Sequence, residues 1–166
     1  MIMKVNRTKL FLNALIVLCF FSCDSLREYD SYVSVANKTW ISSEKIRFPF
    51  TVTDTVLRKN LFINIRNNNE YAFSNLFLIT ELVFPNGKKV IDTLEYEMTD
   101  ASGQFLGKGL TEIKENKLFY KEQVVFPMPG KYAVTIRQSM RKSGAIKGIE
   151  LLKGITDVGF RIEKVN

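Results

Sequence analysis

The sequence predicts an all-β protein, an antiparallel β-sandwich of about eight strands with jelly-roll or immunoglobulin-like topology, preceded by a cleaved N-terminal signal helix. Three observations predict this fold. Apolar and polar residues alternate over many short segments, which is the period of a strand with one buried face. Turn-forming residues separate these segments, and the spacing of an amphipathic helix is scarce beyond the N-terminal region. Two sheets that each bury one face against the other satisfy this pattern.

The first 22 residues have the pattern of a secretion signal. Lys4, Arg7 and Lys9 precede an uncharged stretch of 12 residues, Leu10 to Phe21. As a helix this stretch is about 18 Å long at roughly 1.5 Å per residue, whereas a bilayer span needs roughly 20 residues. The segment therefore predicts a cleaved signal and not a permanent transmembrane helix.

A cysteine follows the apolar stretch closely. The small residue Ser22 precedes Cys23, and Asp24 follows, so the polarity changes abruptly. This pattern is typical of a bacterial lipoprotein processing site, and it predicts cleavage after Ser22 and lipid on Cys23. Such an anchor tethers a protein to a membrane without spanning it. The alternative is an ordinary signal peptide that is cut at a nearby small residue; Cys19, inside the apolar stretch, is a poorer acceptor of lipid.

Cleavage at this site divides the chain into a signal peptide of residues 1–22, a lipidated cysteine with a short spacer at residues 23–30, and a single β-sandwich domain of residues 31–166. Three of the 24 basic residues and no acidic one are removed, which leaves 21 Lys and Arg against 17 Asp and Glu, a net charge of +4 in place of +7. The sequence has no histidine, and lipid on Cys23 would leave no free thiol. We therefore expect no metal, no other cofactor and no catalytic residue, because zinc sites of His or Cys and His-assisted nucleophiles are excluded within one mature chain.

Period-two alternation predicts the strands of the sandwich. It is clearest at residues 46–53, where the even positions are all apolar. Pro49 interrupts this segment and has no backbone N–H, so we expect the strand at a sheet edge or with a bulge. The other predicted strands lie at residues 32–36, 61–66, 76–84, 90–98, 118–126, 132–140 and 158–165.

Turn signals lie between several of these strands, at residues 67–69, 85–87, 129–130 and 143–144. Pro85-Asn86-Gly87 is the clearest hairpin signal. Residues 100–116 contain three glycines and little periodicity, and they predict a long loop across one end of the sandwich. Residues 143–154 predict a short helical turn or an irregular crossover.

Two segments suggest chemistry. Asp92, Glu95 and Glu97 could serve glycoside hydrolysis if two of them shared a cleft about 5 to 10 Å across, but solvated charge on a strand face is the simpler interpretation. The segment Gly103 to Gly109 lacks the residue order of a phosphate-binding loop, and no amphipathic helix follows it. We expect a structural turn there.

Two further sets of residues suggest binding. An exposed platform that stacks on sugars could be formed by Trp40, Tyr71, Phe73, Phe77 and Tyr120, although aromatic residues more often fill the core of a sandwich. The C-terminal third is basic through Lys131, Arg137, Arg141, Lys142, Lys147 and Lys153. For an exported lipoprotein we expect no nucleic-acid partner; anionic lipid headgroups, lipopolysaccharide or an acidic protein match such a patch, and a merely solvated surface is the alternative.

A series of short motifs runs along nearly the whole chain. It comprises Ser22-Cys23, Tyr29-Asp30, Trp40, Phe48-x-Phe50, Asp54, Arg66-Asn67-Asn68, Tyr71, Ser74-Asn75-Leu76, Asp92-Thr93-Leu94-Glu95, Gly103-x-x-Leu106-Gly107-x-Gly109, Gly130-Lys131-Tyr132, Met140-Arg141 and Gly154-Ile155-x-Asp157-Val158-Gly159-x-Arg161-Ile162. In their order and spacing these motifs resemble the GldH-type gliding-motility lipoproteins of Bacteroidota.

The resemblance implies a non-enzymatic accessory or assembly component of the cell envelope that is needed for gliding and is linked to type IX secretion. Lipid on Cys23 would anchor it in the membrane, and we expect the outer membrane, on either the periplasmic or the surface face. Its partners would be other envelope or gliding-motility proteins. The candidate partner-binding residues are Trp40, Arg66, Asn67, Tyr71, Asn75 and Arg141. A surface carbohydrate-binding lipoprotein is the alternative function, and a glycan-active enzyme is a third.

Overall fold

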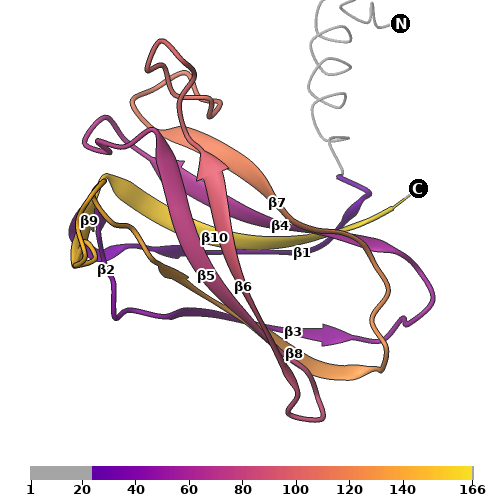
Figure 1. Cartoon of the computed structure of the whole chain (residues 1–166). Helices are drawn as coiled ribbons and strands as arrows, with labels where there is room; N and C mark the ends of the chain where they lie inside the picture. The colour runs from indigo at the N-terminus through magenta and orange to yellow at the C-terminus, as the bar shows by residue number, and fades with distance from the viewer. Residues whose placement is uncertain (1–23, 166) are drawn as a thin grey trace, which may run out of the picture.

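A computed structural model describes residues 24–165. The predicted signal helix, the cleavage site at Ser22 and the lipid site at Cys23 lie outside the described residues. Within these residues, no helix is long and apolar enough to cross a bilayer. The described chain forms ten strands and one short 3-10 helix (Figure 1): β1 (Arg27–Ser34), η1 (Ala36–Lys38), β2 (Thr39–Ile41), β3 (Ile46–Val52), β4 (Lys59–Asn67), β5 (Asn75–Val83), β6 (Lys89–Glu97), β7 (Lys114–Val124), β8 (Gly130–Gln138), β9 (Leu151–Lys153) and β10 (Ile155–Lys164).

Two four-stranded antiparallel sheets pack face to face. One has the order β1-β10-β4-β7 and the other β3-β8-β5-β6, while β2 and β9 form a small separate pair. If β2 and β9 are left aside, the sheets contain the first, eighth, third and sixth strands and the second, seventh, fourth and fifth strands in chain order. This is the strand order of a jelly roll. The predicted all-β antiparallel sandwich is confirmed, and the jelly roll is the correct one of its two proposed topologies.

The core between the sheets follows the period-two alternation. In β3 the residues at even positions are buried and those at odd positions are exposed, because successive side chains point to opposite faces of a strand. Phe50 stacks on Tyr132 of the neighbouring strand β8 and contacts Phe160 across the sandwich, with ring centroids 5.6 Å apart in both pairs. Pro49 lies on β3 at the edge of its sheet, as predicted.

The hairpin and loop predictions are confirmed in part. Phe84 N–H donates to the Lys88 carbonyl at 2.8 Å, and Gly87 has a φ of +81°, so residues 85–87 form the turn between β5 and β6. The long loop is shorter than expected, because pairing with β4 extends β7 back to Lys114. For residues 143–154 the irregular crossover, and not the helical turn, is confirmed: residues 143–150 are irregular, and β9 follows them.

The predicted spacer at residues 23–30 is wrong in its second half, because β1 begins at Arg27. Strand pairing with β10 and several side-chain contacts hold this segment to the domain. The Tyr29 ring packs against Phe50 and Phe160, with centroids 5.8 and 6.0 Å away. The Asp30 carboxylate accepts a hydrogen bond from Arg161 at 2.8 Å. The sandwich therefore starts at Arg27 and not at residue 31.

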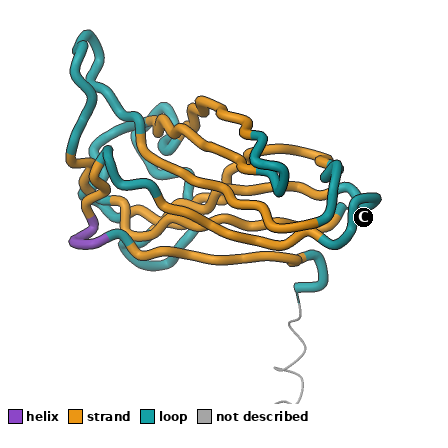
Figure 2. Tube along the Cα trace, turned by 90° about the horizontal axis from the view of Figure 1, so that it is seen from below, coloured by secondary structure: helices purple, strands orange, loops and turns teal. Residues whose placement is uncertain are grey.

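The two ends of the sandwich differ. At one end, here called the terminal end, Lys164 N–H donates to the Leu26 carbonyl at 2.9 Å and Val165 N–H to the Arg58 carbonyl at 3.0 Å. At the other end, the distal end, lie η1, β2, β9 and the loops of residues 98–113 and 139–150. Figures 1 and 2 show the C-terminus and the start of the described chain together at the terminal end, and η1 at the other. Since β1 has eight residues and a strand rises about 3.3 Å per residue, the ends are separated by roughly 25 Å.

Candidate functional site: a basic groove at the distal end

A broad groove of about 1270 Å³ opens at the distal end. Its floor is the outer face of the β3-β8-β5-β6 sheet, where Phe77 of β5, Thr93 of β6 and Arg137 of β8 lie side by side. The segment that follows β8, residues 139–149, forms one wall, and residues 72–75 before and at the start of β5 form the other. Ser42 and Ser43, which precede β3, complete the lining.

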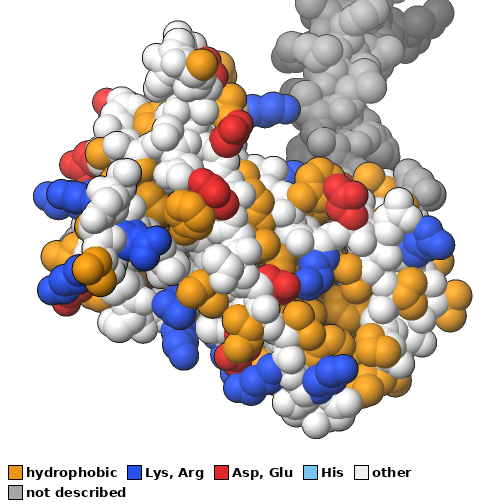
Figure 3. All heavy atoms as spheres, in the orientation of Figure 1, with side chains coloured by type: hydrophobic (Ala, Val, Ile, Leu, Met, Phe, Trp, Pro, Cys, Tyr) orange, Lys and Arg blue, Asp and Glu red, His pale blue; other side chains and the backbone are white. Residues whose placement is uncertain are grey.

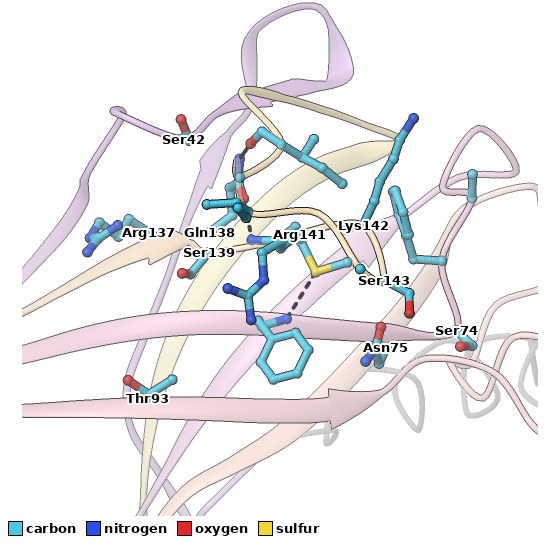
Figure 4. Close-up of a pocket in the computed structure, with 18 of the residues that line it drawn as sticks. Ser42, Ser74, Asn75, Thr93, Arg137, Gln138, Ser139, Arg141, Lys142 and Ser143 are labelled. Carbon is cyan, nitrogen blue, oxygen red and sulfur yellow. Dashed lines mark hydrogen bonds between the residues drawn. The ribbon is translucent and has the colours of Figure 1, made fainter.

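A buried polar framework holds the groove's wall in place. Gln138 is fully buried; its Nε2 donates to the Ile149 carbonyl at 2.8 Å, and its Oε1 accepts from Met140 N–H at 2.8 Å. The Met140 sulfur accepts from Phe77 N–H at 3.2 Å (Figure 4). Because a buried polar group needs its partners, these bonds fix the position of residues 138–149 over β5.

The groove is cationic. Arg137, Arg141 and Lys142 line it, and no carboxylate of residues 24–165 does. In residues 24–165, none of these three side chains forms an ion pair within 4.0 Å, whereas Arg66 and Arg161 each do. Figure 4 shows Arg141 pointing across the groove toward β5 while Lys142 extends outward. The same groove is lined by the hydroxyl groups of Ser42, Ser43, Ser74, Ser139 and Ser143. The arrangement suits an anionic group with several hydrogen-bond acceptors.

The structure brings only two of the predicted partner-binding residues into the groove, Asn75 and Arg141. Asn75 Nδ2 donates to Glu95 Oε1 at 2.7 Å at the edge of the floor. Tyr71 lies beneath this wall and is only 3% exposed, and its hydroxyl donates to the Asn75 carbonyl at 2.6 Å. Burial raises the pKa of Tyr71, so the hydroxyl stays protonated and keeps this bond.

The remaining predicted residues lie elsewhere. Trp40 is fully buried, and its ring N–H donates to the Glu44 carbonyl at 3.3 Å. Asn67 is also fully buried and accepts a hydrogen bond from Asn116 Nδ2 at 2.9 Å. Arg66 lies on the outer face of the other sheet, 4.2 Å from the centre of the Tyr32 ring. These three residues therefore support the fold at separate places.

The proposed sugar-stacking platform is wrong. Trp40, Tyr71 and Tyr120 are at most 8% exposed, and Phe73 and Phe77 are half-buried against the core. The two-sheet core takes these rings because each ring has a large apolar area to bury. The carbohydrate-binding alternative loses the surface on which it depended.

The carboxylates of β6 do not share a cleft. Asp92 points toward β7, where it accepts from the Tyr120 hydroxyl at 3.0 Å and pairs with Lys121 at 2.9 Å. Glu95 and Glu97 occupy the opposite face of this edge strand and are exposed. The alternation of side chains along a strand causes this separation, and it removes the basis for the glycan-active enzyme.

The glycine-containing loop is a structural turn, as expected. Asp100 Oδ1 accepts from Ser102 N–H at 2.8 Å and from Gln104 N–H at 3.0 Å, and Gly103 has a φ of +83°. The Ser102 hydroxyl donates to the same oxygen at 2.7 Å, and this bond, together with the backbone bonds, holds the pKa of Asp100 below its usual value. Among residues 24–165 there is no cluster of three or more Asp, Glu, His or Cys residues that could hold a metal ion.

Several groove residues were not singled out as site residues from the sequence. Arg137 and Lys142 counted only as part of a general basic tendency, and the serines carried no signal of their own. Gln138 did leave a signal, since it is a polar residue at a core-facing position of the strand at residues 132–140.

The fold and the groove define a jelly-roll domain that presents a basic, hydroxyl-rich binding surface at one end. A family model described as GldH lipoprotein matches residues 27–162, and the chain belongs to this family. The resemblance seen in the sequence is thereby confirmed.

Two relatives match over nearly their whole lengths. The chain is 53% identical over 148 residues to a protein of Christiangramia forsetii named gliding motility lipoprotein GldH homolog, covering 89% of this chain and 90% of that protein. It is 48% identical over 162 residues to gliding motility lipoprotein GldH of Flavobacterium johnsoniae, covering 98% and 99%.

Solved structures give only a distant likeness. A VP2 subviral particle of infectious bursal disease virus aligns with a TM-score of 0.38 and 14% identity, over 87% of this chain and 34% of that one. The structure of the Gx strain of the same virus aligns with a TM-score of 0.39 and 12% identity, over the same shares of the two chains. The chain thus spans about a third of the length of these viral proteins.

Proposed function

We propose that this protein is a lipid-anchored, non-enzymatic accessory or assembly component of the gliding-motility machinery, linked to type IX secretion and attached to the outer membrane. Its relatives are named gliding motility lipoproteins, and these names support a role in gliding motility. The pattern Ser22-Cys23 supports cleavage after Ser22 and lipid on Cys23. In this proposal the domain binds other envelope proteins through the groove and performs no chemistry.

The observation that carries the binding role is the set of groove cations that form no ion pair within the described part of the chain. Arg161 lies within a network of carboxylates. By contrast, Arg137, Arg141 and Lys142 line the groove and are open to a ligand. An acidic segment of a partner protein would supply the missing counter-charges. Such complementarity sets specificity and the rate of association more than it sets affinity.

Apolar surface at the same place supports a protein ligand. Ile146 is 99% exposed at the rim, and Phe77 lies half-buried in the floor. Met98 N–H donates to the carbonyl of Ser74, a groove residue, at 2.7 Å, so the loop of residues 98–113 begins beside the groove. This loop carries the fully exposed Leu110. Apolar anchors beside arginines are typical of the centres of protein interfaces.

Charge reversal tests the groove. In a gliding strain that lacks its own GldH, the variant Arg141→Glu should support clearly slower gliding and smaller spreading colonies than the unchanged protein. Lys88→Glu is the matched control, because Lys88 is an exposed residue of the β5–β6 turn, far from the groove, and the charge change is the same. Both proteins should be present in equal amounts by immunoblot. Normal gliding with Arg141→Glu would rule out the groove as the binding site.

Two further measurements test the other parts of the proposal. Labelling of cells with a fatty acid should mark the unchanged protein and leave Cys23→Ala unlabelled; label on that variant would contradict the assigned site. Purified protein should release no product from glycans or peptides, and saturable hydrolysis would contradict the non-enzymatic role.

A further inference from the structure

The terminal end carries an apolar tip that points away from the domain. Val56 and Leu57 of the β3–β4 loop are 81% and 49% exposed, and Val125 of the β7–β8 connection is 47% exposed. Figure 3 shows apolar side chains over this loop at the right of the molecule. Solvent exposure of such residues has an energetic cost that is removed when they enter an apolar phase.

The tip is a built structure and not a loose loop. Asp54 Oδ1 accepts from Val56 N–H at 2.8 Å and from Leu57 N–H at 3.1 Å. These two bonds hold the pKa of Asp54 below its usual value, because they favour the charged carboxylate. Arg58 donates to Gln123 Oε1 at 2.6 Å, which ties the β3–β4 loop to the segment that leads into Val125.

The chain leaves the domain beside this tip. The Leu26 carbonyl accepts from Lys164 N–H, and the next residue, Val165, donates to the Arg58 carbonyl. Arg161 contacts the carboxylate of Asp24 and holds its pKa below the usual value. Cys23 directly precedes Asp24, and consecutive Cα atoms are about 3.8 Å apart. A lipid on Cys23 would therefore bring the terminal end to within a few ångströms of the bilayer surface.

The charges around the tip match a membrane surface. Arg27, Arg58 and Lys164 are exposed near it. On the acidic side, Asp54 caps the turn, and Glu28 pairs with Lys59. Glu122 is exposed and opposes the cations. Apolar residues among cations are typical of segments that lie in the headgroup region, where the cations contact lipid phosphates.

We propose that the terminal end docks on the bilayer, with Val56, Leu57 and Val125 inserted among the lipid headgroups and the distal groove directed away from the membrane. The inference rests on the proposed lipid at Cys23, and it goes further by assigning the domain a fixed orientation. The lipid alone would leave the domain free to tumble on the membrane, whereas a second contact restrains it.

A fluorescent probe tests this orientation. The processed lipoprotein with Val56→Cys is labelled with an environment-sensitive dye and reconstituted into vesicles of phosphatidylethanolamine and phosphatidylglycerol. Because Cys23 carries the lipid, the new cysteine is the one free thiol in the processed chain. Ile146→Cys is the matched control, an apolar position at the groove that is 99% exposed. The dye at position 56 should show blue-shifted emission and at least a twofold quenching by lipids that carry a quencher, while the dye at 146 should show neither.

Flotation of the vesicles separates the two proposals. Protein that floats with an aqueous emission at position 56 would overturn the docking inference alone. Protein that does not float would overturn the lipid anchor and the docking with it. Protein that floats with a quenched dye at 56 and an unquenched dye at 146 would support both.

Discussion

Gly154, between β9 and β10, has no room for a side chain. Its φ is +86°, and a Cβ there would lie 2.2 Å from the backbone nitrogen of Tyr71. We expect Gly154→Ala to lower the free energy of unfolding by at least about 2 to 3 kcal/mol, because backbone strain adds to a backbone clash. The control is Gly144→Ala, at a φ of +74° with nothing within 4 Å, which should cost about 1 kcal/mol. Urea unfolding measures the free energy of unfolding of both variants. If both lose the same amount, the structure around Gly154 shifts to accommodate the added Cβ, and the predicted clash is contradicted.

For single residues, the sequence indicates which side chains are distinctive, but it does not indicate what they contact. It marks Trp40 and Tyr71 as distinctive, but both are in the core, since an aromatic side chain suits a core and a surface platform equally well on composition. Arg66 and Arg141 look alike in the sequence, yet Arg66 pairs with Glu115 at 3.0 Å, whereas Arg141 lines the groove and has no ion pair among residues 24–165. Partners that are 49 residues apart in the chain, as Arg66 and Glu115 are, leave no local pattern.

Among the predicted strands, β1 begins furthest ahead of its expected start, at Arg27 and not at residue 32. A pair of substitutions tests the importance of this strand. Tyr29→Ala should lower the free energy of unfolding by about 2 to 4 kcal/mol, because the ring joins β1 to aromatic residues of both sheets. Val33→Ala, in the same strand but 38% exposed, should cost less than about 1 kcal/mol. Thermal unfolding checks the pair. If both variants match the unchanged protein, residues 27–30 would act as the spacer after all.

The sheet strands were largely predictable, because period-two alternation reports one buried face. Short strands cannot be predicted in this way, because β2 and β9 have only three residues each and three residues are too few to show a period. In β4 and β10 both faces are mostly buried, since a charged network of Lys117, Glu163 and Arg161 covers part of the outer face of their sheet. Strand order was beyond prediction, because it depends on pairing between distant segments. The groove depends on that order, so it could not be located either.

For the whole molecule, the question is whether the small β2–β9 pair unfolds with the sandwich. Trp40, the single tryptophan, lies fully buried in this pair. If the domain is one cooperative unit, tryptophan fluorescence and far-ultraviolet circular dichroism should give the same urea midpoint, because a two-state transition looks alike to every probe. If the fluorescence midpoint lies at a lower urea concentration than the circular dichroism midpoint, the distal end unfolds separately.

The direction of β1 has a mechanical consequence. This strand enters the domain at the terminal end, runs to the distal end, and pairs with β10 along its length. If the proposed lipid stays in the membrane while the cell pulls on the proposed partner in the groove, the tension would run parallel to β1. The hydrogen bonds of an antiparallel ladder lie across the strands, so this tension shears them together and cannot open them one by one. Under the proposed anchor, this strand direction would make the domain resist pulling far better than a domain whose first strand could be peeled away.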